Sequence, residues 1–211
     1  MKKGMCITYT VEDGLYVNVT NRCSNRCEFC IRDNGDGAYG SDSLWLMREP
    51  TVDEILESIY SSNPESFSEV VFCGYGEPTF RLKEIREVAL ALKVKYPGIK
   101  IRVNTNGQSD LILGIDTAPL FKDVFDSVSI SLNASNADSY EKICHPKYGK
   151  ETFFSILKFA QNVNKYVQNV GFSVVRETLS EIELQRCEKI ARDTGVNLRV
   201  RSYIGDKTFS Q

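Results

Sequence analysis

The stretch LYVNVTNRCSNRCEFC, residues 15–30, joins a β-strand pattern to three closely spaced cysteines. Apolar and polar residues alternate over residues 15–20, which is the pattern of a strand with one exposed face. Cys23, Cys27 and Cys30 follow within eight residues, so they belong to the loop at the end of this strand. Thiols at this spacing indicate a metal or iron–sulfur site.

The segments on either side of this stretch predict a hairpin and a long loop. Asp13-Gly14 between two alternating runs predicts a β-hairpin over residues 5–20. After the cysteines, residues 33–50 are rich in Gly, Asp and Ser, which is typical of a binding loop or a lid. The apolar trio WLM at residues 45–47 fits either a lid anchor or a small satellite core.

Helical and extended patterns alternate from residue 51 onward. Thr51 with Glu54, and Ser180 with Glu183, predict capping boxes at the starts of two helices. Strands are predicted over residues 15–20, 70–73, 99–104, 127–132, 170–175 and 196–204. Helical segments are predicted over residues 52–59, 82–92, 137–143, 152–163 and 181–194, with a poorly periodic one ending near residue 121.

This order of elements predicts an α/β fold. Six strands separated by helices are typical of a parallel sheet, and they are two units short of a closed eight-fold barrel. We therefore expect an open, partial (β/α)6 barrel of the TIM type with an N-terminal β-hairpin, formed as a single domain over residues 1–211. Residues 206–211 are expected to be a loose tail.

One face of the predicted sheet is polar. Parallel strands covered on both faces normally form continuous apolar runs, yet polar residues occupy every second position of several strands here. Such a face would line a wet concavity. An antiparallel sheet with one side in water would alternate in the same way, although the intervening helices favour parallel crossovers.

Basic residues on this polar face predict an anionic substrate, such as a phosphate or a carboxylate. They are Lys100, Arg102, Arg199 and Arg201. The alternative is that these side chains pair with acids or extend into solvent.

Composition excludes several classes of protein. Lys and Arg total 26 against 28 Asp and Glu, so the net charge of -2 argues against binding nucleic acid by bulk electrostatics. His145 is the single histidine, which excludes histidine-rich zinc sites and most nucleophilic triads. No segment approaches the roughly 18 apolar residues of a membrane span. We expect a soluble, cytoplasmic protein without a membrane partner, in which the 7 cysteines stay reduced.

Spacing alone leaves two interpretations of the three close cysteines. A cubane cluster has four irons and is usually held by four thiolates, so three thiolates leave one iron open to a substrate or cofactor. A structural zinc site with a distant fourth ligand fits the spacing as well. The other thiols, Cys6, Cys73, Cys144 and Cys187, are dispersed and are expected to be buried rather than to bind a second cluster.

Two motifs resemble those of the radical SAM superfamily. Residues 23–30 are similar to its Cys-x3-Cys-x-aromatic-Cys signature, and FCGYGEP at residues 72–78 is similar to its Gly-Gly-Glu-Pro motif. The resemblance covers almost the whole chain. It implies that Cys23, Cys27 and Cys30 bind a [4Fe–4S] cluster whose fourth iron is chelated by S-adenosylmethionine (SAM). It also implies an external electron donor of the flavodoxin or ferredoxin type, and reductive cleavage of SAM to a 5′-deoxyadenosyl radical.

The resemblance further implies that SAM lies at the carboxyl ends of the strands. The residues that match cofactor-binding positions are Phe29, Gly74, Gly76, Glu77, Asn104, Ser131, Asn133 and Arg176. Phe29 would lie beside the adenine, and Glu77 would contact the methionine ammonium group. Ser131 and Asn133 would contact the ribose or the carboxylate. Arg176 would bind the carboxylate through a bidentate pair.

The layout is most similar to the short radical SAM proteins associated with TatD-family hydrolases, which makes such a hydrolase a candidate partner. This resemblance leaves the substrate open. A second hypothesis is a glycyl-radical-enzyme activase, which would act on a partner protein. A third, of another class, is a zinc-stabilised binding module without radical chemistry.

Overall fold

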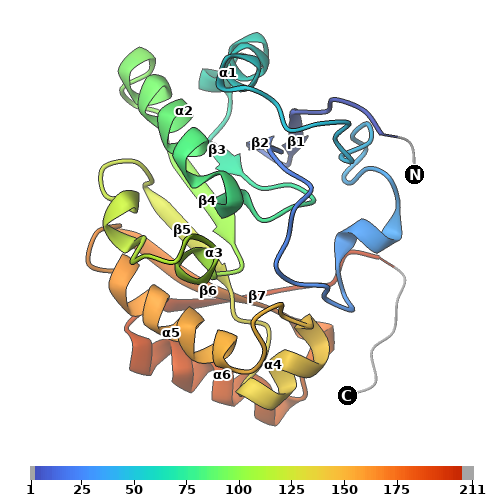
Figure 1. Ribbon diagram of the computed structural model, residues 1–211, viewed down its shortest axis with the longest axis vertical. Helices are drawn as coiled ribbons and strands as arrows, with labels where there is room; N and C mark the ends of the chain where they lie inside the picture. Colours follow the sequence, from blue (N-terminus) through green and yellow to red (C-terminus); the bar gives the residue numbers. More distant parts are fainter. Residues whose placement is uncertain (1–2, 206–211) are drawn as a thin grey trace.

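The computed structural model describes residues 3–205, and the expected tail at residues 206–211 lies outside the described residues. One sheet follows the order of the chain from β1 to β7 (Figure 1). Its strands are β1 (Thr8–Val11), β2 (Gly14–Val17), β3 (Glu69–Phe72), β4 (Ile101–Thr105), β5 (Ser127–Ser131), β6 (Asn169–Val175) and β7 (Asn197–Arg201). β1 pairs antiparallel with β2, and every later pair is parallel. The predicted parallel sheet with an N-terminal hairpin is confirmed, and the antiparallel alternative is wrong.

Helices surround the outside of this sheet, from α1 and α2 at the top of Figure 1 to α5 and α6 at the bottom. They are α1 (Val52–Ser61), α2 (Leu82–Lys95), α3 (Ser109–Leu113), α4 (Ala137–Cys144), α5 (Glu151–Val163) and α6 (Glu181–Thr194). Short 3-10 turns are η1 (Ile31–Asn34), η2 (Pro64–Ser66), η3 (Pro78–Arg81), η4 (Ala118–Phe121) and η5 (Arg176–Thr178). The poorly periodic region contains only α3 and η4. Within residues 3–205, none of the helices has the length and apolar character that a membrane span requires.

Two strands, β2 and β7, end three residues earlier than predicted. β2 ends at Val17 because its neighbour β3 ends at Phe72, which pairs with Val17. β7 ends at Arg201, which pairs with Val175, the last residue of β6. Beyond these points the chain leaves the sheet and forms loops at its carboxyl edge. These loops include the three close cysteines.

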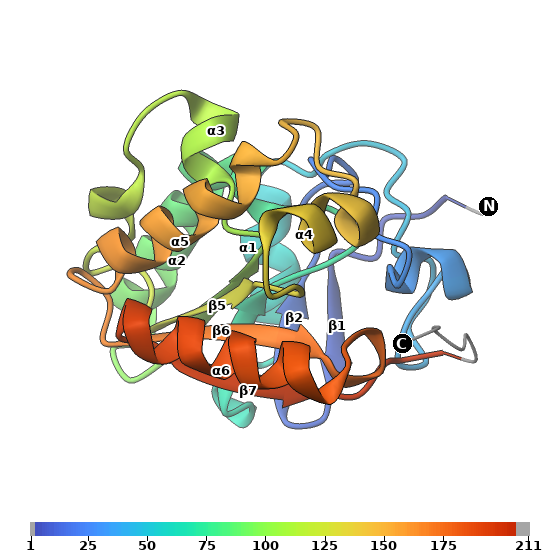
Figure 2. The same cartoon turned by 90° about the horizontal axis from the view of Figure 1, so that it is seen from below.

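The sheet is amphipathic, as its sequence predicts. In β5, Val128 and Ile130 are buried, whereas Ser127, Ser129 and Ser131 are partly exposed. The apolar face joins the inward faces of the helices in the main hydrophobic core. A fully buried aliphatic side chain contributes about 1.5–3 kcal/mol, so this face determines which side the helices cover. The polar face is left on the inside of the half-barrel, and Figure 2 shows how the strands turn progressively from β1 to β7.

The long loop after the cysteines packs beside the hairpin. Leu44 and Tyr75 form a second hydrophobic cluster with Tyr9, and Trp45 packs edge-on against Tyr75 with ring centroids 5.2 Å apart. Leu46 is also buried, whereas Met47 is exposed. The satellite core is therefore confirmed for Trp45, the first residue of the WLM trio. A lid function stays a prediction.

Hydrogen bonds connect the two ends of the open barrel at its carboxyl rim. The Tyr203 hydroxyl, after β7, donates to Asn34 Oδ1 in η1 over 3.0 Å. Asn34 Nδ2 donates to the carbonyl oxygen of Ile204. These contacts bring the segment that follows the cysteines next to the segment that follows the last strand.

The predicted capping box of α1 is present and gives a test of helix stability. The Thr51 side chain accepts from the Glu54 amide, and the Glu54 carboxylate accepts from the Thr51 amide. Thr51→Ala is expected to lower the free energy of unfolding by about 1 kcal/mol, measured by urea denaturation. Glu57→Ala, an exposed position on the same helix, is the control and should change it by less than about 0.5 kcal/mol. Equal effects of the two variants would contradict a role for the cap.

Candidate cluster and cofactor site

Cys23, Cys27 and Cys30 lie on the loop between β2 and η1, at the carboxyl edge of the sheet, and all three are partly exposed. The Asn25 amide donates to Cys23 Sγ over 3.5 Å, and Arg32 Nε donates to Cys30 Sγ over 3.2 Å. Within residues 3–205, no three Cys, His, Asp or Glu side chains converge on the position of a single metal ion. The sulfurs instead have separate hydrogen-bond partners. Donors directed at sulfur are suited to thiolate ligands of an iron–sulfur cluster.

The C-terminal end of α4 holds this cysteine loop in place. The amides of Arg26 and Glu28 donate to the carbonyl oxygens of Cys144 and Ile143, each over 3.0 Å. Both carbonyls belong to the last turn of α4, whose acceptors have no partners within the helix. The free carbonyl groups at the end of α4 therefore fix the cysteine loop, which lies more than 100 residues earlier in the chain.

A buried network of polar side chains also holds the cysteine loop in place. Asn25 Nδ2 donates to the Tyr140 hydroxyl over 2.9 Å, and Gln108 Nε2 donates to Asn25 Oδ1 over 2.7 Å. All three side chains are buried. Sequence reasoning missed these residues. The position of Asn25 between the cysteines was a usable signal, but nothing local marks Tyr140 or Gln108.

The thiol of Cys144, at the end of α4, forms a hydrogen bond with Cys27 of the cysteine loop. This hydrogen bond is the main cause that lowers the pKa of Cys27, against the opposing effect of burial. Burial raises the pKa of Cys144 well above its usual value, and it raises the pKa of Cys23 to about 12. The thiolate is the form that binds metal, so Cys27 is the sulfur of this pair that is more readily deprotonated. Cys144 and Cys187 are buried as predicted, whereas Cys6 and Cys73 are partly exposed.

Glu77 connects the loops after β3 and β4. Its Oε1 accepts from the amide and hydroxyl of Thr79 and from the Thr105 hydroxyl, at 3.1, 2.7 and 2.7 Å. Its Oε2 accepts from the Asn106 amide at 2.6 Å. Burial raises the pKa of Glu77, and these donors oppose the shift. The structure shows a positioning role for this carboxylate, and its direct contact with a SAM ammonium group stays a prediction.

The turn after β4 carries this connection to the cysteine loop. Asn106 Nδ2 donates to Ser24 Oγ over 2.8 Å. Asn104, the cofactor-binding candidate at the end of β4, lies on the polar face, where its Oδ1 accepts from Arg102 and its side chain also bonds to Cys73. The turn after β4 is therefore next to the cysteine loop through Asn106, while Asn104 faces the inside of the half-barrel.

Replacing Glu77 with glutamine is expected to destabilise the fold by about 1–3 kcal/mol. An amide has one oxygen, so its NH2 group would face at least one of the buried donors that now bond to the carboxylate. Urea denaturation measures the loss. Glu87→Gln makes the same change at an exposed position of α2 and should be nearly neutral. Equal unfolding midpoints for the two variants would argue against the network.

Gly74 and Gly76 are required because this loop packs closely against the segment after β2. A Cβ atom on Gly74 would lie 2.1 Å from Asn18 Oδ1, and one on Gly76 would lie 2.3 Å from the carbonyl oxygen of Thr20. Such contacts are sterically excluded. The close approach that the glycines permit here is to the protein's own chain, immediately beside the cysteine loop.

The remaining cofactor-binding candidates lie in different surroundings. Phe29 is buried in the main core. Ser131 is partly exposed at the end of β5, and Asn133 is buried and contacts Cys144. Arg176 has protein partners in this structure, and its contact with the SAM carboxylate stays a prediction. Its guanidinium donates to the carbonyl oxygen of Leu179, which follows η5, over 2.8 Å, and pairs with Glu181 in the first turn of α6 over 3.0 Å.

The basic residues of the polar face have different partners. Arg102 forms an ion pair with Glu69 over 2.7 Å, so the alternative of pairing with an acid is confirmed for this residue. It also lines a shallow cavity of about 220 Å³ with Arg199. Arg199 has no carboxylate within ion-pair distance among residues 3–205. Lys100 and Arg199 are exposed.

The open parallel barrel and the thiol loop at the carboxyl edge of its sheet define a cofactor-dependent α/β enzyme. The model of the Radical SAM superfamily matches residues 17–187, and the chain belongs to this superfamily of enzymes. Its members use a [4Fe–4S] cluster and SAM, and the three thiols with their N–H donors fit that cluster. This membership favours an enzyme over the zinc-stabilised binding module.

The individual relatives share less than a third of their aligned residues with this chain, and each is longer than this chain. Molybdenum cofactor biosynthesis protein 1 of Drosophila melanogaster is 27% identical over 190 residues, which cover 90% of this chain and 31% of that protein. GTP 3′,8-cyclase of Clostridium perfringens (strain 13 / Type A) is 26% identical over 188 residues, with coverages of 89% and 54%. The structure of Streptococcus suis SuiB bound to precursor peptide SuiA aligns with a TM-score of 0.67 at 16% identity, covering 91% of this chain and 39% of SuiB. The chain thus spans less than two thirds of each.

Proposed function

We propose that this chain binds a [4Fe–4S] cluster through Cys23, Cys27 and Cys30 and cleaves SAM reductively. The observation that carries the proposal is the cysteine loop at the carboxyl edge of the sheet, fixed by α4 and by the loops after β3 and β4. When bound, the cluster would supply the electron that breaks a carbon–sulfur bond of SAM and gives a 5′-deoxyadenosyl radical. An external flavodoxin- or ferredoxin-type donor would provide that electron.

The chain's own residues would orient SAM and exclude water. Gly74 and Gly76 keep main chain, rather than side chains, beside the cysteine loop, and Glu77 holds that main chain in position. Ser131 would contact the ribose from the polar face. Phe29 would pack beside the adenine, as the motif implies.

The substrate is proposed to be anionic. Arg199, which is exposed beside the shallow cavity, supports this, as does the substrate in the name of the relatives called GTP 3′,8-cyclase. A protein substrate, as for a glycyl-radical-enzyme activase, is the second candidate, and the structural neighbour SuiB bound to a precursor peptide favours keeping it. Membership of the TatD-associated group, with a hydrolase partner, rests on the sequence resemblance alone. A single domain over residues 1–211 and a cytoplasmic location complete the proposal.

Anaerobic reconstitution tests this function. The chain should take up about four irons and four sulfides, show broad visible absorbance, and release 5′-deoxyadenosine when reduced with dithionite in the presence of SAM. Mass spectrometry detects that product. An intact cluster without product would overturn the proposed reaction, and binding of zinc alone would overturn the cluster.

A further inference from the structure

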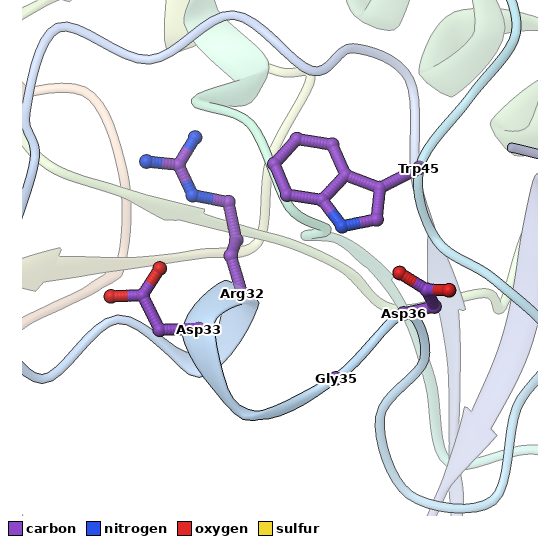
Figure 3. Close-up of a pocket in the computed structure, with 5 residues that line it drawn as sticks. All are labelled: Arg32, Asp33, Gly35, Asp36 and Trp45. Atoms are coloured by element: carbon purple, nitrogen blue, oxygen red, sulfur yellow. The ribbon is translucent and has the colours of Figure 1, made fainter. Parts of the chain in front are cut away.

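A cavity of about 440 Å³ is lined largely by the residues that follow the last cysteine of the loop. Arg32, Asp33, Gly35, Asp36 and Trp45 line it, and Figure 3 shows the arginine and the indole ring beside one another in this hollow. Because Arg32 is only two residues from Cys30, the cavity adjoins the proposed cluster site.

Two contacts orient the guanidinium of Arg32. Nε donates to Cys30 Sγ over 3.2 Å, and the guanidinium carbon lies 5.7 Å from the centroid of the Trp45 ring. Trp45 is itself fixed against Tyr75, whose hydroxyl donates to the Gly35 carbonyl over 2.9 Å. The satellite core therefore positions a permanent positive charge on a cysteine sulfur.

That charge acts on the whole cysteine loop. Arg32 interacts electrostatically with Cys23, Cys27 and Cys30. Hydrogen bonds to ligand sulfurs and nearby charges set the reduction potentials of iron–sulfur clusters. A cation stabilises the reduced cluster more than the oxidised one, since the reduced form carries one more negative charge. The side chain is half-buried, which limits solvent screening.

On the basis of the proposed function, we propose that Arg32, stacked on Trp45, is a positioning residue that raises the reduction potential of a cluster bound at Cys30. It would make the cluster easier to reduce before SAM cleavage. The same contact explains why the long loop packs its only tryptophan beside the cysteines.

The test is an anaerobic redox titration of the reconstituted full chain in the absence of SAM. Electron paramagnetic resonance measures the reduced cluster at each potential. Arg32→Gln is expected to shift the oxidised-to-reduced equilibrium about tenfold toward the oxidised form, which is about 59 mV more negative for one electron. Arg32→Lys, which keeps the charge without the Nε donor, should shift it less. Arg192→Gln is the matched control, because Arg192 is an exposed arginine on α6, outside the cysteine loop, and it should leave the potential near the wild-type value.

The outcomes separate this inference from the proposed function. A wild-type chain that forms no cluster would overturn the proposed function. A wild-type cluster with an Arg32→Gln potential equal to that of Arg192→Gln would overturn only the role of Arg32, including the case in which Arg32 serves SAM binding alone. If Arg32→Gln holds no cluster, Trp45→Leu decides, because it keeps the arginine and removes its stacking partner. A potential that is unchanged in Trp45→Leu would then overturn the inference.

Discussion

Replacing Cys27 with alanine is expected to reduce iron–sulfur content and 5′-deoxyadenosine formation to background. Cys27 is one of three thiols in the loop, so its loss leaves two protein ligands for a cluster that is normally held by at least three. Cys27 also contacts Cys144, and the backbone amides of its two neighbours donate hydrogen bonds to α4, so it lies where the loop is attached to this helix. Iron and sulfide analysis, visible absorbance and product detection measure the effect.

Cys187→Ala is the matched control for that experiment. Cys187 is a buried thiol on α6, away from the cysteine loop in the sequence and in the sheet order. Its removal should lower stability modestly and leave the cluster in place. A Cys27→Ala protein with full iron content and wild-type product formation would exclude Cys27 as a ligand.

Replacing Gly76 with alanine is expected to be the most damaging single change outside the cysteines. The added Cβ would lie 2.3 Å from the Thr20 carbonyl oxygen and 2.7 Å from that of Arg22. Both are backbone atoms that cannot turn aside, and the Arg22 carbonyl already accepts from the Glu77 amide over 2.7 Å. We expect a loss of about 3 kcal/mol in the free energy of unfolding, together with a fall in cluster retention because Arg22 directly precedes Cys23.

Gly98→Ala is the control for the glycine experiment. A Cβ at Gly98 would meet no atom within 4 Å, so this change should be neutral or slightly stabilising. Urea denaturation of the two variants gives the comparison. Similar unfolding midpoints would show that the loop after β3 can move away from the segment after β2, contrary to the close packing described above.

Local sequence patterns were sufficient for much of the fold. Alternation in β5 correctly predicted which of its side chains are buried, because the pleat of a strand sends successive residues to opposite faces. Thr51 with Glu54 correctly predicted the start of α1, because a capping box involves only neighbours in the chain. The ends of β2 and β7 were not predictable in this way. They depend on where the neighbouring strands β3 and β6 stop.

The cysteine motif was the strongest indication of function in the sequence, and the match to the Radical SAM superfamily agrees with the function that it predicts. The residues that support the motif were not visible. Tyr140 and Gln108 reach Asn25 across 115 and 83 residues of chain, and the connection exists only after the sheet has brought α4 under the loop. The partners of Arg176 were not visible either, since its ion pair with Glu181 of α6 forms only where the chain turns after β6.

The sequence by itself determined the order of elements, the polar and apolar faces of the sheet, and the three thiols, because each of these follows from periodicity or spacing over a few residues. Only the tertiary structure decided which groups surround those thiols. The contacts of Cys27 with Cys144, Ser24 with Asn106, and the stacking of Arg32 on Trp45 depend on how loops from separate strands meet at one edge of the sheet. Such meetings are set by long-range packing, which no short stretch of the chain specifies.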